Sequence, residues 1–118
     1  MTEKTRLGKI EVSPSAIASI ASHAVLKSYG VVGMSSATMR DGIAEVLTGD
    51  RSKKGVQVRL DHNQISIDLF VVIEYGTRIS VVAENIMCAV KFSVEKTLGV
   101  SVKEVNVHVQ GLRVSSAD

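Results

Sequence analysis

The sequence has few aromatic residues, a single cysteine, a single proline and no long hydrophobic run. Aromatic residues make up 3% of the 118 residues and tryptophan is absent, so the core must consist of Val, Ile, Leu and Ala. Because Cys88 is the only cysteine, no disulfide can form within the chain. The longest uninterrupted apolar runs, Leu69–Ile73 and Ile86–Val90, have five residues each, whereas about 20 are needed to span a bilayer.

The overall charge of the chain is also small. A formal net charge of +2 does not by itself imply binding to nucleic acid or to an anionic membrane. The N-terminal residues, MTEKTRLGK, lack the apolar stretch of a signal peptide. We therefore expect a cytoplasmic protein without a transmembrane segment, either free or held at the membrane surface by a partner.

The stretch from Thr77 to Gly99 has the features of one long helix. Thr77 is placed to act as the N-cap, and Gly99 suits the left-handed residue that follows a helix C-terminus. Apolar residues at helical spacing predict one buried stripe, which consists of Ile79, Val82, Ala83, Ile86, Val90 and Val94.

A second apolar stripe, formed by Val81, Cys88 and Phe92, lies nearly opposite the first. A helix in a two-layer domain needs only one buried stripe, so another part of the chain or another copy must cover the second. Phe70 and Val72 stand out in the same way on the otherwise polar face of a predicted strand. We predict that one of these two sets forms the interaction surface of a homo-oligomer.

Alternating apolar and polar residues predict strands at 56–61, 64–75 and 102–110, with a tight turn at His62–Asn63 between the first two. The inward positions of the second strand are Ile65, Ile67, Leu69, Val71 and Ile73. Its outward positions include Phe70 and Val72. Val105, Val107 and Val109 are the inward positions of the last strand.

The N-terminal half begins with a strand at 8–12 and a helix that follows Ser13 and Pro14, an N-cap and a first-turn proline. This helix of mostly small residues runs to about residue 28 and ends at Gly30. Residues 31–34 form either a short strand or an extended connector. The pattern is weakest at 35–55, where Asp41 could cap a short helix and residues 48–55 read as a basic loop.

These elements predict an α+β fold of two layers: a small mixed sheet of three to four strands with two long helices packed on one face. The single domain spans residues 7–112, and residues 1–6 and 113–118 are expected to be flexible tails.

No pattern of residues indicates a chemistry. His23, His62 and His108 are scattered over different elements without the short spacing of metal ligands, and Cys88 reads as a buried or interface thiol. No phosphate-binding glycine motif or nucleophile elbow is present. We expect no catalytic residues, no metal and no cofactor.

One alternative remains open, a KH-like nucleic-acid-binding module. Gly30-Val31-Val32-Gly33 matches the G-x-x-G loop that clamps a nucleic-acid backbone, and Arg51, Lys53 and Lys54 form a basic patch. The centre of the motif is apolar, however, and no aromatic residue for base stacking lies near the patch. We therefore prefer a helix end followed by a hydrophobic connector, and expect no nucleic acid as partner.

The order of three segments resembles the alkaline-shock, or general-stress (envelope stress response), protein family of Gram-positive bacteria. The segments are GKIEVSPSAIASIASHAVLKSYGVVG, then GVQVRLDHNQISIDLFVVIEYGTRI, then VEKTLGVSVKEVNVHVQGL. The resemblance covers nearly the whole chain and is loosest over 34–54.

The resemblance implies a small cytoplasmic protein without catalytic residues. Members of this family are tied to cell-envelope and alkaline stress and tend to self-associate, and some sit at the membrane through a separate anchor. The expected partners are accordingly a second copy, a membrane-anchoring protein or a family-related protein.

Overall fold

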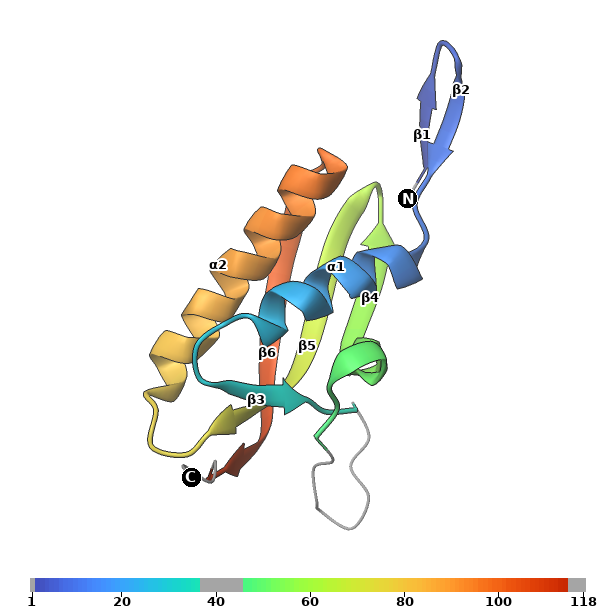
Figure 1. Cartoon of the computed structure of the whole chain (residues 1–118). Helices are drawn as coiled ribbons and strands as arrows, with labels where there is room; N and C mark the ends of the chain where they lie inside the picture. The colour runs from blue at the N-terminus through green and yellow to red at the C-terminus, as the bar shows by residue number, and fades with distance from the viewer. Residues whose placement is uncertain (1, 37–45, 115–118) are drawn as a thin grey trace.

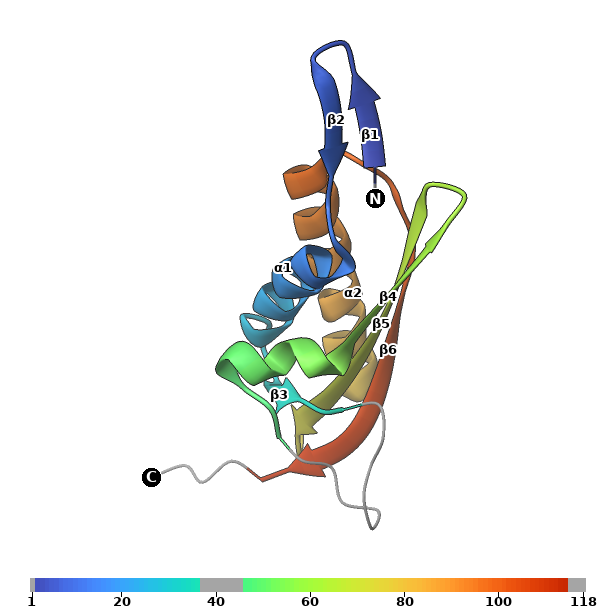
Figure 2. The same ribbon diagram turned by 90° about the vertical axis from the view of Figure 1, so that its right-hand side faces the viewer.

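The computed structural model describes residues 2–36 and 46–114 and has two helices packed against one face of a mixed sheet, with a small hairpin extending from one end (Figures 1 and 2). Its elements are β1 (Thr2–Thr5), β2 (Gly8–Glu11), α1 (Pro14–Leu26), β3 (Val31–Met34), the 3-10 helix η1 (Gly49–Gly55), β4 (Val56–Asp61), β5 (Gln64–Glu74), α2 (Ile79–Leu98) and β6 (Val102–Arg113). The predicted α+β class and two-layer arrangement are confirmed.

Strand β5 is the centre of the sheet. Along one edge it pairs antiparallel with β4 through residues 64–69 and with β3 through residues 71–73. Along the other edge it pairs in parallel with β6 over residues 65–74. Because β5 contacts all three other strands, its inward residues form the middle of the core. All five predicted ones are fully buried: Ile65, Ile67, Leu69, Val71 and Ile73.

The turn between β4 and β5 confirms the predicted hairpin. His62 and Asn63 have φ angles of 50° and 64°, so both residues of the two-residue loop are left-handed. Such a loop has the twist that two antiparallel strands require. Leu60, which alternation placed inward, is exposed near this end of β4, and Val109 of β6 is exposed as well.

The long helix α2 buries four of the six residues of the predicted stripe, while Ile79 is exposed and Ala83 is half-buried. Val82, Ile86, Val90 and Val94 are its buried residues, and Gly99 follows it with a φ of 72°. The N-cap prediction is wrong by one residue: Arg78 occupies that position without a side-chain cap. The Thr77 hydroxyl instead donates a 2.8 Å hydrogen bond to the carbonyl of Glu74 and so closes the turn from β5.

Helix α1 begins as predicted, with the Ser13 hydroxyl accepting a 3.1 Å hydrogen bond from the amide of Ala16 and Pro14 in the first turn. Its small residues allow it to pack against α2 and β4. At its end Gly30 has a φ of 85°, and a Cβ there would lie 2.9 Å from a methyl group of Val82. Only glycine fits both this backbone and this close approach.

The structure corrects two predictions about polar segments. Residues 2–5, predicted to be part of a flexible tail, form β1 and pair with β2 in a hairpin. Residues 49–55, predicted as a loop, form the 3-10 helix η1. Of the two alternatives for residues 31–34, a short strand or an extended connector, the structure has the strand, β3. The short helix that Asp41 could cap lies mostly outside the described residues.

We predict that Ile86→Ala lowers the free energy of unfolding by about 2–5 kcal/mol, because it empties a fully buried position between α2 and the sheet. Urea denaturation measures the difference. Ile79→Ala is the control, since the structure leaves Ile79 partly exposed although helical spacing placed it in the core stripe. A loss below about 1 kcal/mol for Ile86→Ala would contradict this packing.

Candidate functional site

The second apolar stripe of α2 lies on the molecular surface. Phe92 is 65% exposed and Val81 44% exposed, and Cys88 between them is also exposed. The ammonium group of Lys96 lies 5.5 Å from the centre of the Phe92 ring, which covers only part of that ring. The residues that the structure describes therefore leave this stripe uncovered, and the three predicted residues share one exposed side of α2.

A groove between α1 and α2 borders this stripe. It consists of two adjoining depressions of about 300 and 370 Å³, and Tyr29 and Asn85 line both. Val81 lines the first depression, and Ala89 lines the second. The exposed ring of Tyr29 thus extends the apolar surface of α2 towards the end of α1.

The second predicted surface, Phe70 with Val72, does not exist as an exposed patch. Val72 is fully buried, because it pairs with Gly33 of β3 and the side chain of Val46 lies on the same face as this pair. Phe70 is partly buried and stacks on the imidazole of His108, with ring centroids 4.6 Å apart.

A polar network lies beside Phe70 on the outer face of the sheet, with Asp68 at its centre. The guanidinium of Arg59 contacts one carboxylate oxygen at 3.0 Å. The Asn106 amide donates to the other oxygen at 3.1 Å, and His108 Nε2 lies 3.2 Å from the same atom. Arg59 also lies 3.5 Å from Glu104. Asp68 thereby connects β4, β5 and β6 through their side chains.

These contacts determine the protonation of Asp68, whose side chain is only 14% exposed. Burial alone would raise the pKa of this carboxyl group. The hydrogen bonds from His108 and Asn106 and the positive charge of Arg59 outweigh that effect, so the pKa lies below its ordinary value. The carboxylate form therefore contributes to the stability of the folded sheet.

Sequence reasoning missed this network. Alternation placed Asp68, Asn106 and His108 on the outward face, but their convergence depends on the register among three strands. Among residues 2–36 and 46–114, no group of three or more His, Cys, Asp or Glu side chains could hold a metal ion. The hydrogen bonds of the network join side chains of neighbouring strands, so the network stabilises the sheet.

The KH-like geometry is absent. Gly30 and Gly33 are both buried, Gly33 within β3, so the motif is not an exposed loop. A Cβ at Gly33 would lie 2.6 Å from a methyl group of Val46, which explains the glycine by packing rather than by a phosphate. Arg51, Lys53 and Lys54 are exposed on η1, which contacts β3, but the buried glycines leave no exposed loop beside them.

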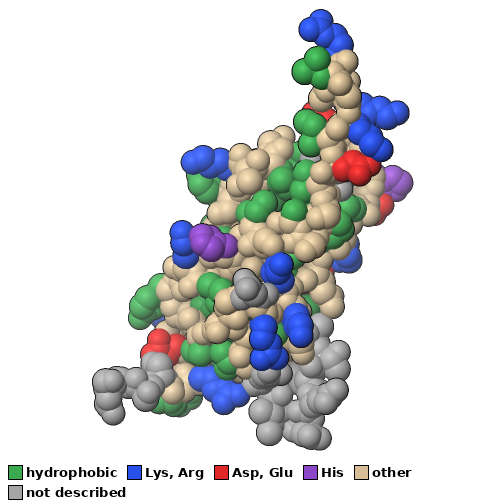
Figure 3. Space-filling model, turned by 45° about the vertical axis from the view of Figure 1, so that its right-hand side comes forward, with side chains coloured by type: hydrophobic (Ala, Val, Ile, Leu, Met, Phe, Trp, Pro, Cys, Tyr) green, Lys and Arg blue, Asp and Glu red, His purple; other side chains and the backbone are tan. Residues whose placement is uncertain are grey.

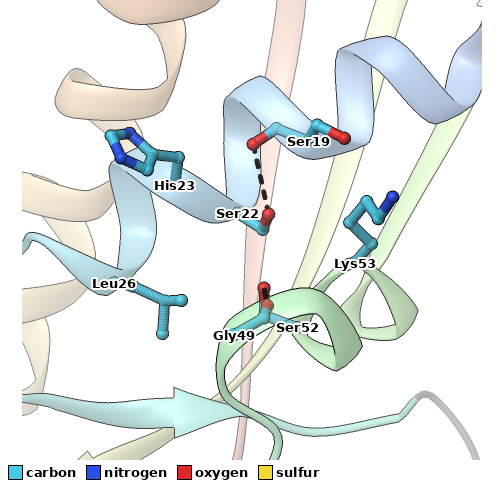
Figure 4. A pocket seen from close by; sticks show the side chains of 7 residues that line it. All are labelled: Ser19, Ser22, His23, Leu26, Gly49, Ser52 and Lys53. Atoms are coloured by element: carbon cyan, nitrogen blue, oxygen red, sulfur yellow. Dashed lines mark hydrogen bonds between the residues drawn. The ribbon is translucent and has the colours of Figure 1, made fainter.

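A cavity of about 300 Å³ separates η1 from α1 (Figure 4). Ser22 of α1 and Ser52 of η1 face each other across it, with His23 and Lys53 at its margins. The Ser22 hydroxyl donates to the carbonyl of Ser19, and the Ser52 hydroxyl donates to the carbonyl of Gly49. Their hydrogens are thus already engaged within the chain, and the cavity lacks converging donors for an anion.

None of the helices in the described part of the chain is long and apolar enough to cross a membrane.

Comparison with known proteins adds the following similarities. The model of the alkaline shock protein 23 family, described as having a cell envelope-related function, matches residues 2–114. The YloU protein of Bacillus subtilis (strain 168) is 42% identical over 114 residues, which cover 96% of this chain and 95% of that protein. The Spy1614 protein of Streptococcus pyogenes serotype M6 is 38% identical, with 93% and 92% covered. A solved zinc form of the MamM CTD, 15% identical, covers 86% of this chain and 85% of its own with a TM-score of 0.48.

We predict that Asp68→Asn lowers the free energy of unfolding at neutral pH by about 1–3 kcal/mol, because it removes the charge that Arg59 and His108 contact. The pKa of Asp68 is lower in the folded state, so its stabilising effect is fully present above the unfolded value of about 4 and fades at lower pH. Denaturation measured between pH 7 and pH 3 should therefore show the two proteins converging as the pH falls below about 4. A constant difference across this range would contradict the account.

Proposed function

Because the chain belongs to the alkaline shock protein 23 family, whose function is cell envelope-related, we propose that it is a non-catalytic interaction module that works by self-association. The observation that carries this proposal is the exposed stripe of Val81, Cys88 and Phe92 on a helix whose opposite side is buried from Val82 to Val94. Water contact with this apolar area costs about 25 cal/mol per Å², and a covering surface would recover that free energy.

A second copy of α2 fits this stripe in an antiparallel orientation. Packing Val81 against the partner's Phe92 brings Asn85 opposite the partner's Cys88, since both pairs are related by the same two-fold axis. The same alignment brings Arg78, near the start of the helix, level with the partner's Glu95, near its end. Helical spacing places Arg78 and Glu95 on opposite flanks of the stripe, so a two-fold axis leaves them on opposite sides of the contact and the alignment rests on the apolar side chains.

This alignment places a contact between Val81 and Phe92 on each side of a central pair of Asn85 and Cys88. The aromatic side chain supplies most of the affinity, because it is the largest side chain of the stripe. Cell-envelope members could engage a membrane-anchoring or family-related protein through the same stripe. We favour a second copy because each chain carries both Val81 and Phe92, so the same contact forms twice about the two-fold axis.

The non-catalytic character is part of the proposal. The most connected polar group of the described chain is the Asp68 network, and its hydrogen bonds join neighbouring strands. The groove beside α2 is lined by Tyr29, Asn85 and small or apolar residues, with the cations Lys27 and Arg78 among them, and an aromatic ring beside basic side chains suits contact with another protein surface.

We predict that Phe92→Glu leaves the chain folded and raises the dissociation constant of self-association at least about tenfold, because Phe92 is the largest side chain of the stripe. Sedimentation velocity over a concentration series gives the association constant, and circular dichroism checks the fold. Leu60→Glu is the matched control, since it places the same charge at an exposed leucine on β4. Val90→Glu should unfold the chain, because Val90 is fully buried.

The proposal fails if the unaltered chain is monomeric throughout the series. It also fails if Leu60→Glu weakens association as much as Phe92→Glu, or if Phe92→Glu unfolds the chain as Val90→Glu does.

A further inference from the structure

The β1–β2 hairpin extends beyond the body of the molecule as an arm (Figures 1 and 2). The molecule measures 55 × 27 × 24 Å along its principal axes, and the arm accounts for much of the long dimension. All residues of both strands are exposed, and the extensive contacts of the arm are between its own two strands. A two-stranded hairpin is only marginally stable in water by itself, so this one is suited to acting against a further surface.

The end of the arm is positively charged. Residues 4–9, KTRLGK, contain three cations and no carboxylate. The two acidic residues of the hairpin, Glu3 and Glu11, lie at its base, and Glu11 forms a 2.8 Å ion pair with Lys9. Figure 3 shows Lys and Arg side chains gathered at this end of the molecule. The local charge of +3 thus exceeds the net charge of the whole chain, which is +2.

An apolar side chain lies among these cations. Leu7 in the turn is 96% exposed. The turn holds it there, because the Thr5 hydroxyl accepts a 3.2 Å hydrogen bond from the Leu7 amide and donates a 3.1 Å hydrogen bond to the Gly8 carbonyl. No described residue covers Leu7, and the arm presents it ahead of the body.

We propose that the tip of this hairpin, residues 4–9, binds the surface of an anionic lipid bilayer. Lys4, Arg6 and Lys9 attract the phosphate headgroups, and Leu7 enters the boundary between headgroups and acyl chains. This inference is independent of the proposed self-association, because it rests on a different element of the fold. It also differs from attachment through a partner, since the chain itself makes the contact.

Charge and composition favour a bilayer over other anionic partners. Nucleic acid without sequence preference is bound through stacking aromatic side chains as well as cations, and residues 2–11 contain no aromatic residue. An isolated leucine at the end of a cationic arm matches a surface whose charged layer overlies an apolar one.

Vesicle co-sedimentation tests the charges. The full chain should bind vesicles of phosphatidylcholine that contain about 30–40% phosphatidylglycerol, because this anionic lipid gives the vesicle a negative surface potential. It should not bind vesicles of phosphatidylcholine alone. The double variant Lys4→Gln/Arg6→Gln should bind about thirtyfold more weakly, since each cation near such a surface contributes about fivefold. Lys53→Gln/Lys54→Gln removes the same charge from η1 and should bind like the unaltered chain.

The absence of tryptophan from the chain allows a direct test of insertion. Leu7→Trp should show fluorescence emission that shifts to shorter wavelength when anionic vesicles are added, because the indole moves from water into the interface. Tyr75→Trp, at an exposed position between β5 and α2, is the control and should show no shift.

Three results would overturn the proposal. Equal loss of binding in the two double variants would mean that the overall charge, not the tip, attracts the vesicle. An unchanged Leu7→Trp emission spectrum with bound vesicles would mean that the tip stays in water. A shift of that spectrum with rising protein concentration and no vesicles would mean that the tip packs on a second copy.

Discussion

Burial of one side of α2 against the sheet is the contact on which the rest of this structure depends. Its residues from Val82 to Val94 lie in one hydrophobic core with the inward residues of β5, while α2 itself packs along β6, and β5 is the strand with which β3, β4 and β6 all pair. The same helix sets the position of β6, because Gly99 ends it in a left-handed conformation and the chain returns in parallel beside β5. Glu95 joins the two elements by accepting a 2.8 Å hydrogen bond from the amide of Val102.

The same constraint explains which apolar side chains of α2 remain exposed. A single sheet face can bury only one stripe of a helix, and α1 packs beside α2 without covering its outer side. Phe92 and Val81 are therefore left to another molecule, which is why we propose self-association. The hairpin tip lies at the far end of the arm and uses cations with one leucine. An assembly of several copies would present several tips, and such multivalency strengthens weak individual contacts.

Much of the fold follows from local patterns in the sequence. Alternation predicts β4 and β5 and the five inward residues of β5, all of which are buried, and Ser13, Pro14 and Gly99 mark helix boundaries by their own chemistry. The stripe of Val81, Cys88 and Phe92 is also predictable, since helical spacing alone places it opposite the core. These features depend on neighbours a few residues apart.

The features that sequence reasoning missed depend on contacts between distant segments. The sequence alone predicts that Val72 is an exposed apolar residue. In the structure it is buried, because β3 pairs beside it and Val46 lies on the same face. The Asp68 network requires the register of three strands to be known. A strand at 8–12 is predictable and is present as β2, but β1 has no apolar residue to give a period and is recognisable only through its pairing with β2.

The reaction rate of Cys88 with a maleimide reagent, measured across a range of protein concentrations, tests the central claim most directly. Cys88 is the only cysteine, and it lies in the middle of the exposed stripe. If α2 is covered by a second copy, the rate per chain should fall as the concentration rises and should recover on dilution. A rate that is the same at every concentration would show that the stripe remains in water, and would contradict the account.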